Sequence, residues 1–285
     1  MDPAHGSVPS QAIEVRVAGE RSVPVRVWRG PDPRAAIVLV HGLGEHGGRY
    51  AALASALVGA GLMVFAPDLP GHGMQPGARG DLHWTDVRDR LLPALLDHAS
   101  HELGDASPRF LFGHSLGGVM ALDHALAHPE RLAGLVLSSP GLRIPAPPAW
   151  KVALARLVCA LAPAAGFPNG LDPAGLSRDA EVVQRYRTDP LVHDRISPRT
   201  FFAFRDAAER GRRGAQTLRV PTFLVHGMAD RLVDPRGSLE FAAAAPADRV
   251  RFTRFEQGAH ELFNDLDRDA AIAALVAWLH ERMSA

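Results

Sequence analysis

The stretch that most constrains this chain covers residues 110–118 and reads FLFGHSLGG. Its apolar start has strand character, and the Ala- and Leu-rich residues after it have helical character. A G-x-S-x-G pattern between a strand and a helix is typical of a nucleophile elbow, a tight turn that exposes a serine hydroxyl. The turn requires small residues two positions before and after Ser115, and Gly113 and Gly117 meet that requirement.

The order of the predicted elements indicates an α/β fold. Ile13–Val17 and Val23–Trp28 alternate apolar with polar residues and predict an antiparallel hairpin at a sheet edge. Apolar runs typical of buried strands then alternate with helical patterns, which favours a mostly parallel, eight-stranded sheet with helices on both faces. The predicted strands after the hairpin are Ala35–Val40, Leu62–Ala66, Arg109–Phe112, Gly134–Leu137, Pro221–Val225 and Val250–Phe255, with helices over 50–60, 84–103, 116–127 and 268–282.

Residues 141–218 interrupt this alternation. They hold several prolines and helical patterns but no clear buried strand, which predicts a helical cap inserted over the strand ends. Residues 1–140 and 219–285 would then form the core. Ala149–Leu161 carries a wide apolar surface, for which the sequence leaves two interpretations open. It is either a helix packed on the core or a lid that contacts lipid or guards an apolar pocket.

A nucleophilic serine needs a base to take its proton and an acid to orient that base. In folds with this elbow the chain order is serine, acid, histidine. Asp230 follows the strand Pro221–Val225 within HGMAD, and His260 follows the last predicted strand within GAHE. Asp234 is the rival acid, but its position before Pro235 indicates a helix start instead.

The oxyanion that forms when such a serine attacks a carbonyl group also needs two N–H donors. The residue after the nucleophile, Leu116, is predicted to supply one backbone N–H. Leu43, in the glycine-rich loop after Ala35–Val40, is predicted to supply the other. His41 is expected to support this loop rather than to take part in the chemistry.

Several blocks of sequence point to a known family. They are HGLGEHGGRY from His41, FAPDLPGHG from Phe65, GHSLGG from Gly113, LVLSSP from Leu135, YRTDPL from Tyr186, HGMADRLVD from His226 and GAHELFND from Gly258. On these blocks the chain resembles the monoacylglycerol lipase and lysophospholipase branch of the α/β-hydrolases. Two departures are Met74, where the family commonly has serine, and the cap, most of which has no match.

This resemblance implies an α/β-hydrolase fold with a Ser115–Asp230–His260 triad and an oxyanion hole at Leu43 and Leu116. It also implies that three further residues lie near the polar leaving-group end of the substrate: Glu45, Arg49 and Tyr186. The residues alone equally allow Glu45 and Arg49 to pair with each other or to cap the following helix.

We therefore predict a serine hydrolase that cleaves carboxylic esters through an acyl-enzyme, with a small lipid ester, monoacylglycerol, as the expected substrate. Lysophospholipase and general carboxylesterase activities are the alternatives within this class. No cofactor is expected.

Parts of the sequence also fit other classes of protein. Gly42, Gly44 and Gly47, with Asp68 about twenty residues on, fit a dinucleotide fingerprint and would suggest a nucleotide-binding reductase. That interpretation leaves the elbow, Asp230 and His260 unexplained. A non-catalytic binding protein of the hydrolase fold is disfavoured by the complete set of triad residues. A metal site is not predicted, because there is no H-E-x-x-H and because His46 and His114 lack clear carboxylate partners.

Composition limits the setting and the partners. The formal net charge is +0 and the pI about 7.3, which gives no electrostatic case for nucleic acid. Cys159 is the only cysteine, so no internal disulfide is expected. Met1–Ala12 lacks the apolar core of a signal peptide, and Arg156 and Pro163 interrupt the apolar run 152–167. We expect a soluble cytoplasmic protein that contacts membrane surfaces transiently, if at all, through the cap; the sequence gives no oligomeric state.

Overall fold

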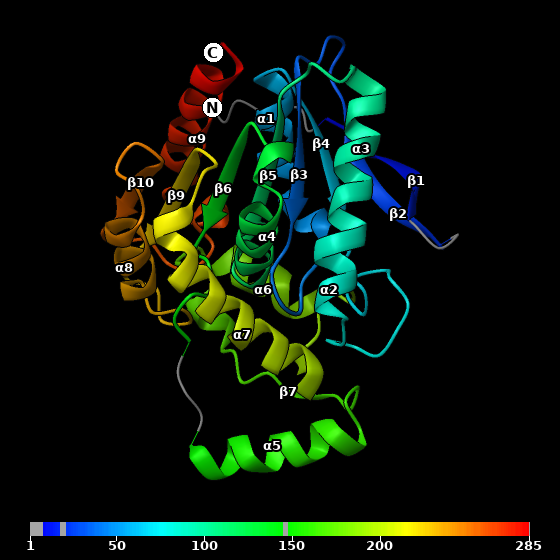
Figure 1. The fold of residues 1–285 in the computed structure, drawn as a ribbon, viewed down its shortest axis with the longest axis vertical. Helices are drawn as coiled ribbons and strands as arrows, with labels where there is room; N and C mark the ends of the chain where they lie inside the picture. The colour runs from blue at the N-terminus through cyan, green and yellow to red at the C-terminus, as the bar shows by residue number, and fades with distance from the viewer. Residues whose placement is uncertain (1–7, 18–20, 145–147, 285) are drawn as a thin grey trace.

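The sheet organises the fold. The computed structural model describes residues 8–17, 21–144 and 148–284, so part of the segment Met1–Ala12 lies outside the described residues. Within these ranges, eight strands form one sheet in the order β1-β2-β4-β3-β5-β6-β9-β10, with β2 antiparallel to both neighbours and the other pairs parallel (Figure 1). The strands are β1 Gln11–Val17, β2 Arg21–Trp28, β3 Ala35–Val40, β4 Leu62–Pro67, β5 Arg109–His114, β6 Gly134–Ser138, β9 Thr222–Gly227 and β10 Val250–Phe255. The predicted α/β-hydrolase sheet is confirmed.

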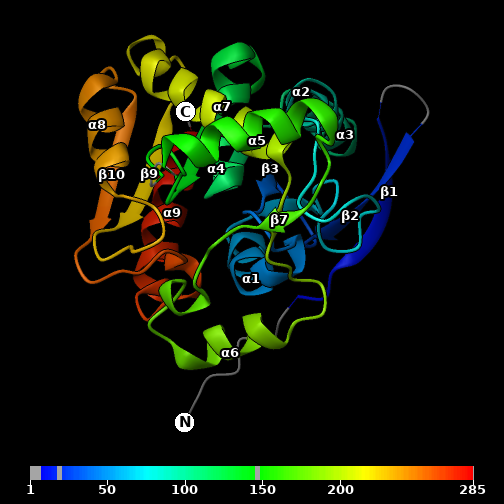
Figure 2. The same ribbon diagram turned by 90° about the horizontal axis from the view of Figure 1, so that it is seen from below.

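Helices cover both faces of the sheet, because alternate residues of each central strand need partners on opposite sides. On β3, Val38 and Val40 pack in one apolar cluster with helices α3 and α4, whereas Ile37 and Leu39 pack in a second with α1 and α9. Figure 2 shows these two helix pairs on opposite sides of the strands. The helices are α1 Ala51–Gly59, α3 Leu92–Leu103, α4 Leu116–Ala127, α8 Arg236–Ala244 and α9 Arg268–Met283.

Several predicted elements begin and end where the structure places them, β10 included. The wholly apolar run of β3 begins and ends as predicted, and so does the elbow helix α4. The helix predicted over 84–103 instead contains three parts: α2 Trp84–Asp86, a wider π-helical turn Val87–Leu91, and α3. Pro93 has no N–H to continue the ordinary helical hydrogen bonds, and the wider turn ends two residues before it.

The chain between β6 and β9 lies near the carboxyl ends of the strands (Figure 1). Helix α7 packs on the body of the molecule through Phe204, Ala207 and Ala208, which join the cluster that contains α4. The boundaries 141–218 of the predicted cap include three residues, 145–147, outside the described ranges and stay a prediction. The elements here are α5 Ala149–Leu161, β7 Phe167–Pro168, α6 Ala180–Thr188, β8 Arg195–Ile196 and α7 Pro198–Gly214.

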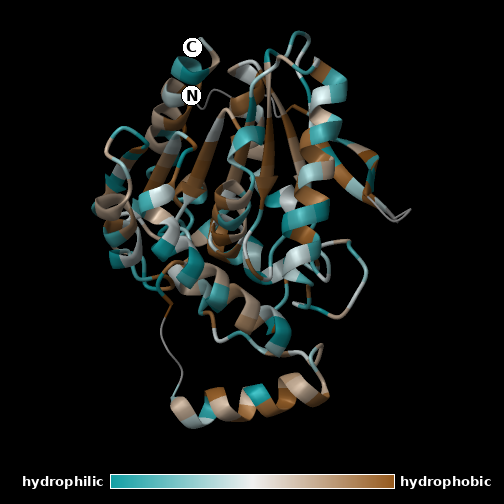
Figure 3. Cartoon of the chain, in the orientation of Figure 1, coloured by the Kyte–Doolittle hydropathy of each residue, from teal (hydrophilic) through white to brown (hydrophobic). Residues whose placement is uncertain are grey.

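Helix α5 differs from every other long helix. All of its residues are described, and none is buried. Figure 3 shows it at one end of the molecule with apolar residues along its length, and its neighbour in the fold is α7. None of the helices in the described ranges combines the length and apolar character needed to span a membrane.

Candidate active site

Ser115 lies at the tip of the turn between β5 and α4, in a backbone conformation that few non-glycine residues adopt. Its φ and ψ are 54° and −115°. The backbone N–H of Ser115 donates to the carbonyl of Ser138, 3.0 Å away, and its carbonyl accepts from the N–H of Gly141 at 3.1 Å. The strand β6 and the residues after it therefore hold the strained turn in place.

Glycines beside the elbow are required by close backbone contacts, as predicted. A Cβ atom on Gly113 would collide with the carbonyl of Gly117, and one on Gly117 would collide with the carbonyls of Val40 and His41. The strand β5, the helix α4 and the end of β3 therefore meet backbone to backbone beneath Ser115.

Asp230 and His260 are hydrogen-bonded to each other from the loops after β9 and β10. His260 Nδ1 lies 2.7 Å from Asp230 Oδ2, and both side chains are almost completely buried. The other oxygen, Asp230 Oδ1, accepts from the backbone N–H groups of Leu232 and Val233 at 2.8 and 3.0 Å. The carboxylate is thus fixed in orientation, with one oxygen directed at the imidazole.

Residues at the end of β6 bond to both the Ser115 turn and the His260 loop. Ser138 holds the backbone of Ser115, and the next residue, Ser139, donates its hydroxyl to the carbonyl of His260 at 2.8 Å. The rings of His260 and His114, the residue before the serine, have centroids 4.7 Å apart. Ser139 and Ser115 are the two non-glycine residues with positive φ in the described part of the chain. Backbone strain is thus concentrated beside both predicted catalytic side chains.

His226 contacts the same carboxylate oxygen and was not predicted to take part. Its Nε2 lies 3.0 Å from Asp230 Oδ2 and its Nδ1 lies 2.7 Å from Ser238 Oγ. The spacing His226-Gly-Met-Ala-Asp230 contained the only sequence signal for this pair. Asp230 therefore accepts from two imidazoles and two backbone amides.

The charges of this cluster set its protonation states. Burial alone would raise the pKa of Asp230, but the charge of His260 and the hydrogen bonds from His226 and His260 hold this pKa well below its usual range. Burial alone would lower the pKa of His260, but Asp230, followed by Glu261 and Glu45, raises it above its ordinary value. Burial, together with the neighbouring His260, lowers the pKa of His114 to about 3. Of these two neighbouring imidazoles, His260 is therefore the more basic.

The predicted oxyanion donors lie on two segments that meet at Ser115. Leu116 is the first residue of α4, where backbone N–H groups have no helical partner and the helix dipole is positive. Leu43 lies in the loop after β3, next to Gly42, where an added Cβ would lie 3.3 Å from Ser115 Cβ. His41 supports this loop, because its Nδ1 lies 2.8 Å from the carbonyl of Gly42 and its Nε2 accepts from Leu69 N–H at 2.9 Å.

Glu45, Arg49 and Tyr186 lie together, and their side chains contact one another and other residues of the protein. Glu45 Oε2 accepts from Arg49 Nη1 at 2.6 Å, and the Arg49 guanidinium lies 4.7 Å from the centre of the Tyr186 ring. Arg49 also pairs with Glu261, a contact that the sequence did not predict. The alternative that Glu45 and Arg49 pair with each other is therefore confirmed, and a role in substrate binding stays a prediction.

His46 has a carboxylate partner, so the expectation that it lacks one was wrong. Its Nε2 lies 2.8 Å from Asp189 Oδ2, which is 143 residues further along the chain. No local pattern could indicate so distant a pair. Among the described residues, no group of three or more His, Cys, Asp or Glu side chains is placed to hold a metal ion.

Asp234 and Asp68 have structural partners outside the triad. Asp234 lies just before α8, as predicted, and pairs with Arg143 and Arg236. Asp68 accepts from Arg26 and from the backbone of Gly47. A 3₁₀-helical turn, Gly47–Tyr50, leads directly into α1, but the Asp68 carboxylate that a dinucleotide fingerprint would offer to a ribose is bound by these protein groups instead.

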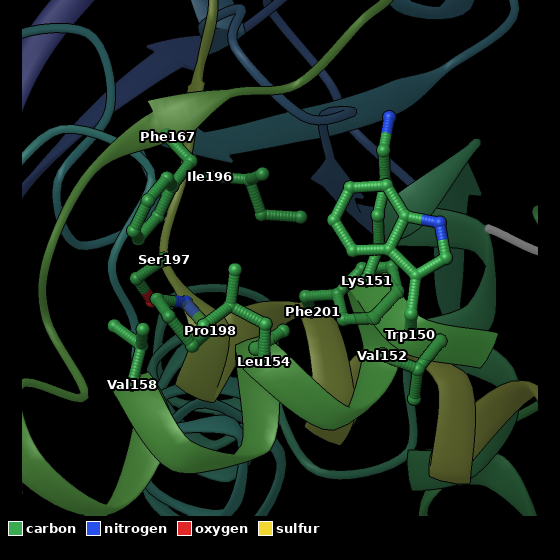
Figure 4. Close-up of a pocket in the computed structure, with 11 residues that line it drawn as sticks. Trp150, Lys151, Val152, Leu154, Val158, Phe167, Ile196, Ser197, Pro198 and Phe201 are labelled. Atoms are coloured by element: carbon green, nitrogen blue, oxygen red, sulfur yellow. The ribbon is translucent and has the colours of Figure 1, made fainter. Parts of the chain in front are cut away.

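An apolar groove of about 400 Å³ lies between α5 and the start of α7. Figure 4 shows Leu154 and Val158 of α5 on one side of it, with Phe167, Ile196 and Phe201 also lining it. Ser115, Asp230 and His260 are not among its lining residues. The groove is therefore a feature of the segment between β6 and β9 rather than of the strand ends.

The elbow, the strand-end acid and histidine, and the eight-stranded sheet define an α/β-hydrolase with a serine nucleophile site. A family model described as "Serine aminopeptidase, S33" matches residues 31–267, so the chain belongs to this family of α/β-hydrolases.

The relatives point to one branch of that family. The chain is 32% identical over 262 residues to a monoacylglycerol lipase of Mycolicibacterium smegmatis, covering 89% of this chain and 91% of that protein. It is 33% identical over 270 residues to human monoglyceride lipase, covering 90% and 86%. It also matches an uncharacterized abhydrolase domain-containing protein of Dictyostelium discoideum at 30% identity over 285 residues, covering 96% of this chain but only 29% of that longer protein.

A solved structure agrees with these relatives. The crystal structure of a monoacylglycerol lipase from Paleococcus ferrophilus matches with a TM-score of 0.84 and 37% identity, covering 92% of this chain and all of that one. The chain is therefore a serine hydrolase of the branch that contains lipases and esterases.

Proposed function

We propose that this chain hydrolyses esters of single-chain lipids, with monoacylglycerol as the preferred substrate. The observation that supports the chemistry most directly is the 2.7 Å contact between His260 Nδ1 and Asp230 Oδ2, next to a strained serine. The substrate class is inferred from the relatives named monoacylglycerol or monoglyceride lipase. A groove of about 400 Å³ lined almost wholly by apolar side chains could hold an alkyl chain.

In the proposed mechanism, Ser115 Oγ attacks the ester carbonyl while His260 Nε2 takes its proton. The negative charge on the carbonyl oxygen is stabilised by the N–H groups of Leu43 and Leu116. Asp230 stabilises the imidazolium, which then protonates the leaving alcohol as the C–O bond breaks. Water attacks the acyl-enzyme, His260 removes its proton, and the fatty acid leaves as Ser115 regains its hydrogen.

Residues 141–218 are proposed to act as a cap over this site. Helix α5 would meet the lipid surface, because Trp150, Leu157 and Leu161 are exposed and its charged residues, Lys151 and Arg156, are both basic. A helix with exposed apolar residues and basic charges suits the boundary between lipid headgroups and acyl chains.

The proposal is tested with a panel of substrates given to the wild type, Ser115→Ala and His260→Ala. The panel contains monoacylglycerol, lysophosphatidylcholine, triacylglycerol, a short nitrophenyl ester and an aminoacyl anilide. We expect both variants to fold, as measured by circular dichroism and thermal unfolding, and to lose about 10⁴-fold or more of kcat/KM.

The pattern across the panel decides the substrate class. Serine-dependent turnover led by monoacylglycerol supports the proposal. Turnover led by lysophosphatidylcholine, the short ester or the anilide would replace it with a lysophospholipase, a general esterase or a peptidase respectively. Activity retained in Ser115→Ala would contradict the proposed mechanism itself.

A further inference from the structure

Three buried charged side chains, Glu45, Arg49 and Glu261, form a hydrogen-bonded cluster beside the predicted triad. Arg49 Nη1 lies 2.6 Å from Glu45 Oε2 and 2.6 Å from Glu261 Oε1, and Arg49 Nη2 lies 2.8 Å from Glu261 Oε2. The side chains of Glu45, Arg49 and Glu261 are only 4%, 9% and 4% exposed. Pairing of this kind is required, because a buried charge without a partner is strongly destabilising.

The two outer members of this cluster, Glu45 and Glu261, contact or lie in the two loops that the proposed reaction needs. Glu45 Oε1 accepts from the backbone N–H of Gly42 at 2.7 Å, immediately before Leu43. Glu261, at the other end, directly follows His260 in the sequence. Arg49 therefore joins the loop after β3 to the loop after β10 through charge-assisted hydrogen bonds.

Other protein groups occupy the remaining acceptor positions. Tyr50 donates its hydroxyl to Glu45 Oε1 at 2.7 Å, and Asn264 Nδ2 donates to Glu261 Oε2 at 3.1 Å. The Tyr186 ring lies over the guanidinium of Arg49. Every carboxylate oxygen of the cluster has a partner within the protein, as expected of a structural network.

We propose that Glu261 is a positioning residue. It acts through Arg49 and Glu45 to hold the loop after β3, which contains the predicted oxyanion donor Leu43, in a fixed place relative to His260. This inference rests on the serine hydrolase mechanism proposed above. It gives Glu45 and Arg49 a role that does not depend on the alcohol of the substrate, and it adds Glu261, which the sequence did not single out.

The cluster also affects the charge of His260. The groups that face His260 are Asp230 from the loop after β9, Glu261 from its own loop, Glu45 from the loop after β3, and His114 from β5. The cluster holds two carboxylates and one guanidinium, so its net charge is negative. Removing one carboxylate charge should therefore make the imidazolium of His260 easier to deprotonate.

The experiment compares Glu261→Gln, Glu45→Gln and the double variant, each with two substrates. One is monoacylglycerol, and the other is a short nitrophenyl ester, whose leaving group contains no glycerol. Glu281→Gln is the matched control, because Glu281 pairs with Arg251 at the surface of α9. Thermal unfolding of each variant is measured in parallel.

We expect each single variant to lower kcat by about 10- to 100-fold on both substrates, with KM within about twofold, because a small displacement of catalytic groups has this effect. The double variant should lose less than the product of the two single losses, because both act through Arg49. The acid limb of kcat/KM should move to lower pH in Glu261→Gln, and the control should match the wild type.

Two results would overturn the inference. A loss confined to monoacylglycerol, mainly in KM, would assign the cluster to binding of the leaving group. Unchanged kinetics on both substrates would reduce the cluster to a structural ion pair. If Glu261→Gln does not fold, Arg49→Lys is judged by the same criteria, since lysine keeps the charge but cannot donate in parallel to both oxygens of Glu261. Absence of Ser115-dependent turnover in the wild type would instead contradict the proposed function.

Discussion

The strand ends around Ser115 and the helix α5 lie in the same half of the molecule but are held very differently. At the strand ends, Asp230 has four hydrogen-bond donors and Ser115 has both of its backbone groups paired to residues at and just after the end of β6. In α5, Trp150, Leu157 and Leu161 are 65%, 59% and 79% exposed. One region is fixed by polar contacts in a buried setting, and the other leaves its apolar side chains in contact with water.

The contrast shows which region stabilises the fold. A fully buried leucine contributes about 1.5–3 kcal/mol relative to an exposed one, and the central strands contain many such residues. The exposed leucines of α5 contribute little of this kind. The helix therefore has a surface that gains from an apolar partner, whereas the strand ends are already satisfied within the protein.

The sharpest test of the fixed region compares two aspartates in one loop. Asp230→Asn should lower kcat/KM by about 10⁴-fold, because the amide cannot stabilise the imidazolium of His260. Asp234→Asn should change it by less than about threefold, because Asp234 pairs with Arg143 and Arg236 and not with His260. Steady-state hydrolysis of the nitrophenyl ester measures both. Equal losses would reverse the choice of the acid.

A second test compares the two regions through stability. Leu111→Ala, at a fully buried position in β5, should lower the free energy of unfolding by about 2–5 kcal/mol. Leu157→Ala, on α5, should change it by less than about 0.5 kcal/mol. Equilibrium denaturation with urea measures both. A large cost at Leu157 would mean that α5 is packed against a partner in solution, and the contrast drawn above would fail.

The smallest expected effect concerns His226, and it tests whether this second imidazole contributes to the role of Asp230. His226→Leu removes one of the two imidazoles that contact Asp230 Oδ2 and should lower kcat by about 10- to 100-fold, since a hydrogen bond to a charged group contributes about 1.5–3 kcal/mol. Ser238→Ala, which removes only the contact to His226 Nδ1, should have a smaller effect. Single-turnover kinetics separates this loss from binding, and an unchanged rate in His226→Leu would leave His226 without a role.

Sequence alone predicted the parts of the molecule that local patterns determine. The run Ala35–Val40 is apolar throughout, as expected of a strand covered on both faces, and the glycines around Ser115 indicate the elbow. Asp230 and His260 were predicted from their places after strands, and they are hydrogen-bonded as expected.

Contacts between distant segments were the ones that sequence missed. Arg49 and Glu261 are 212 residues apart, and His46 and Asp189 are 143 apart. Nothing in the spacing of either pair along the chain signals the contact, since only the folded sheet brings the loops after β3 and β10 together. The four-residue spacing of Glu45 and Arg49, by contrast, did allow their pairing to be considered.

The backbone contacts at Gly113 and Gly117 limit how this chain could diversify. Any side chain at either position would collide with main-chain carbonyls, so random libraries directed at the elbow should yield mostly misfolded clones. Libraries directed at Ala149–Leu161 should yield mostly folded clones, because no residue there is buried. The chain thus separates the residues that must be inherited unchanged from those free to vary, and new substrate preferences can be selected in α5 without first adding stability elsewhere.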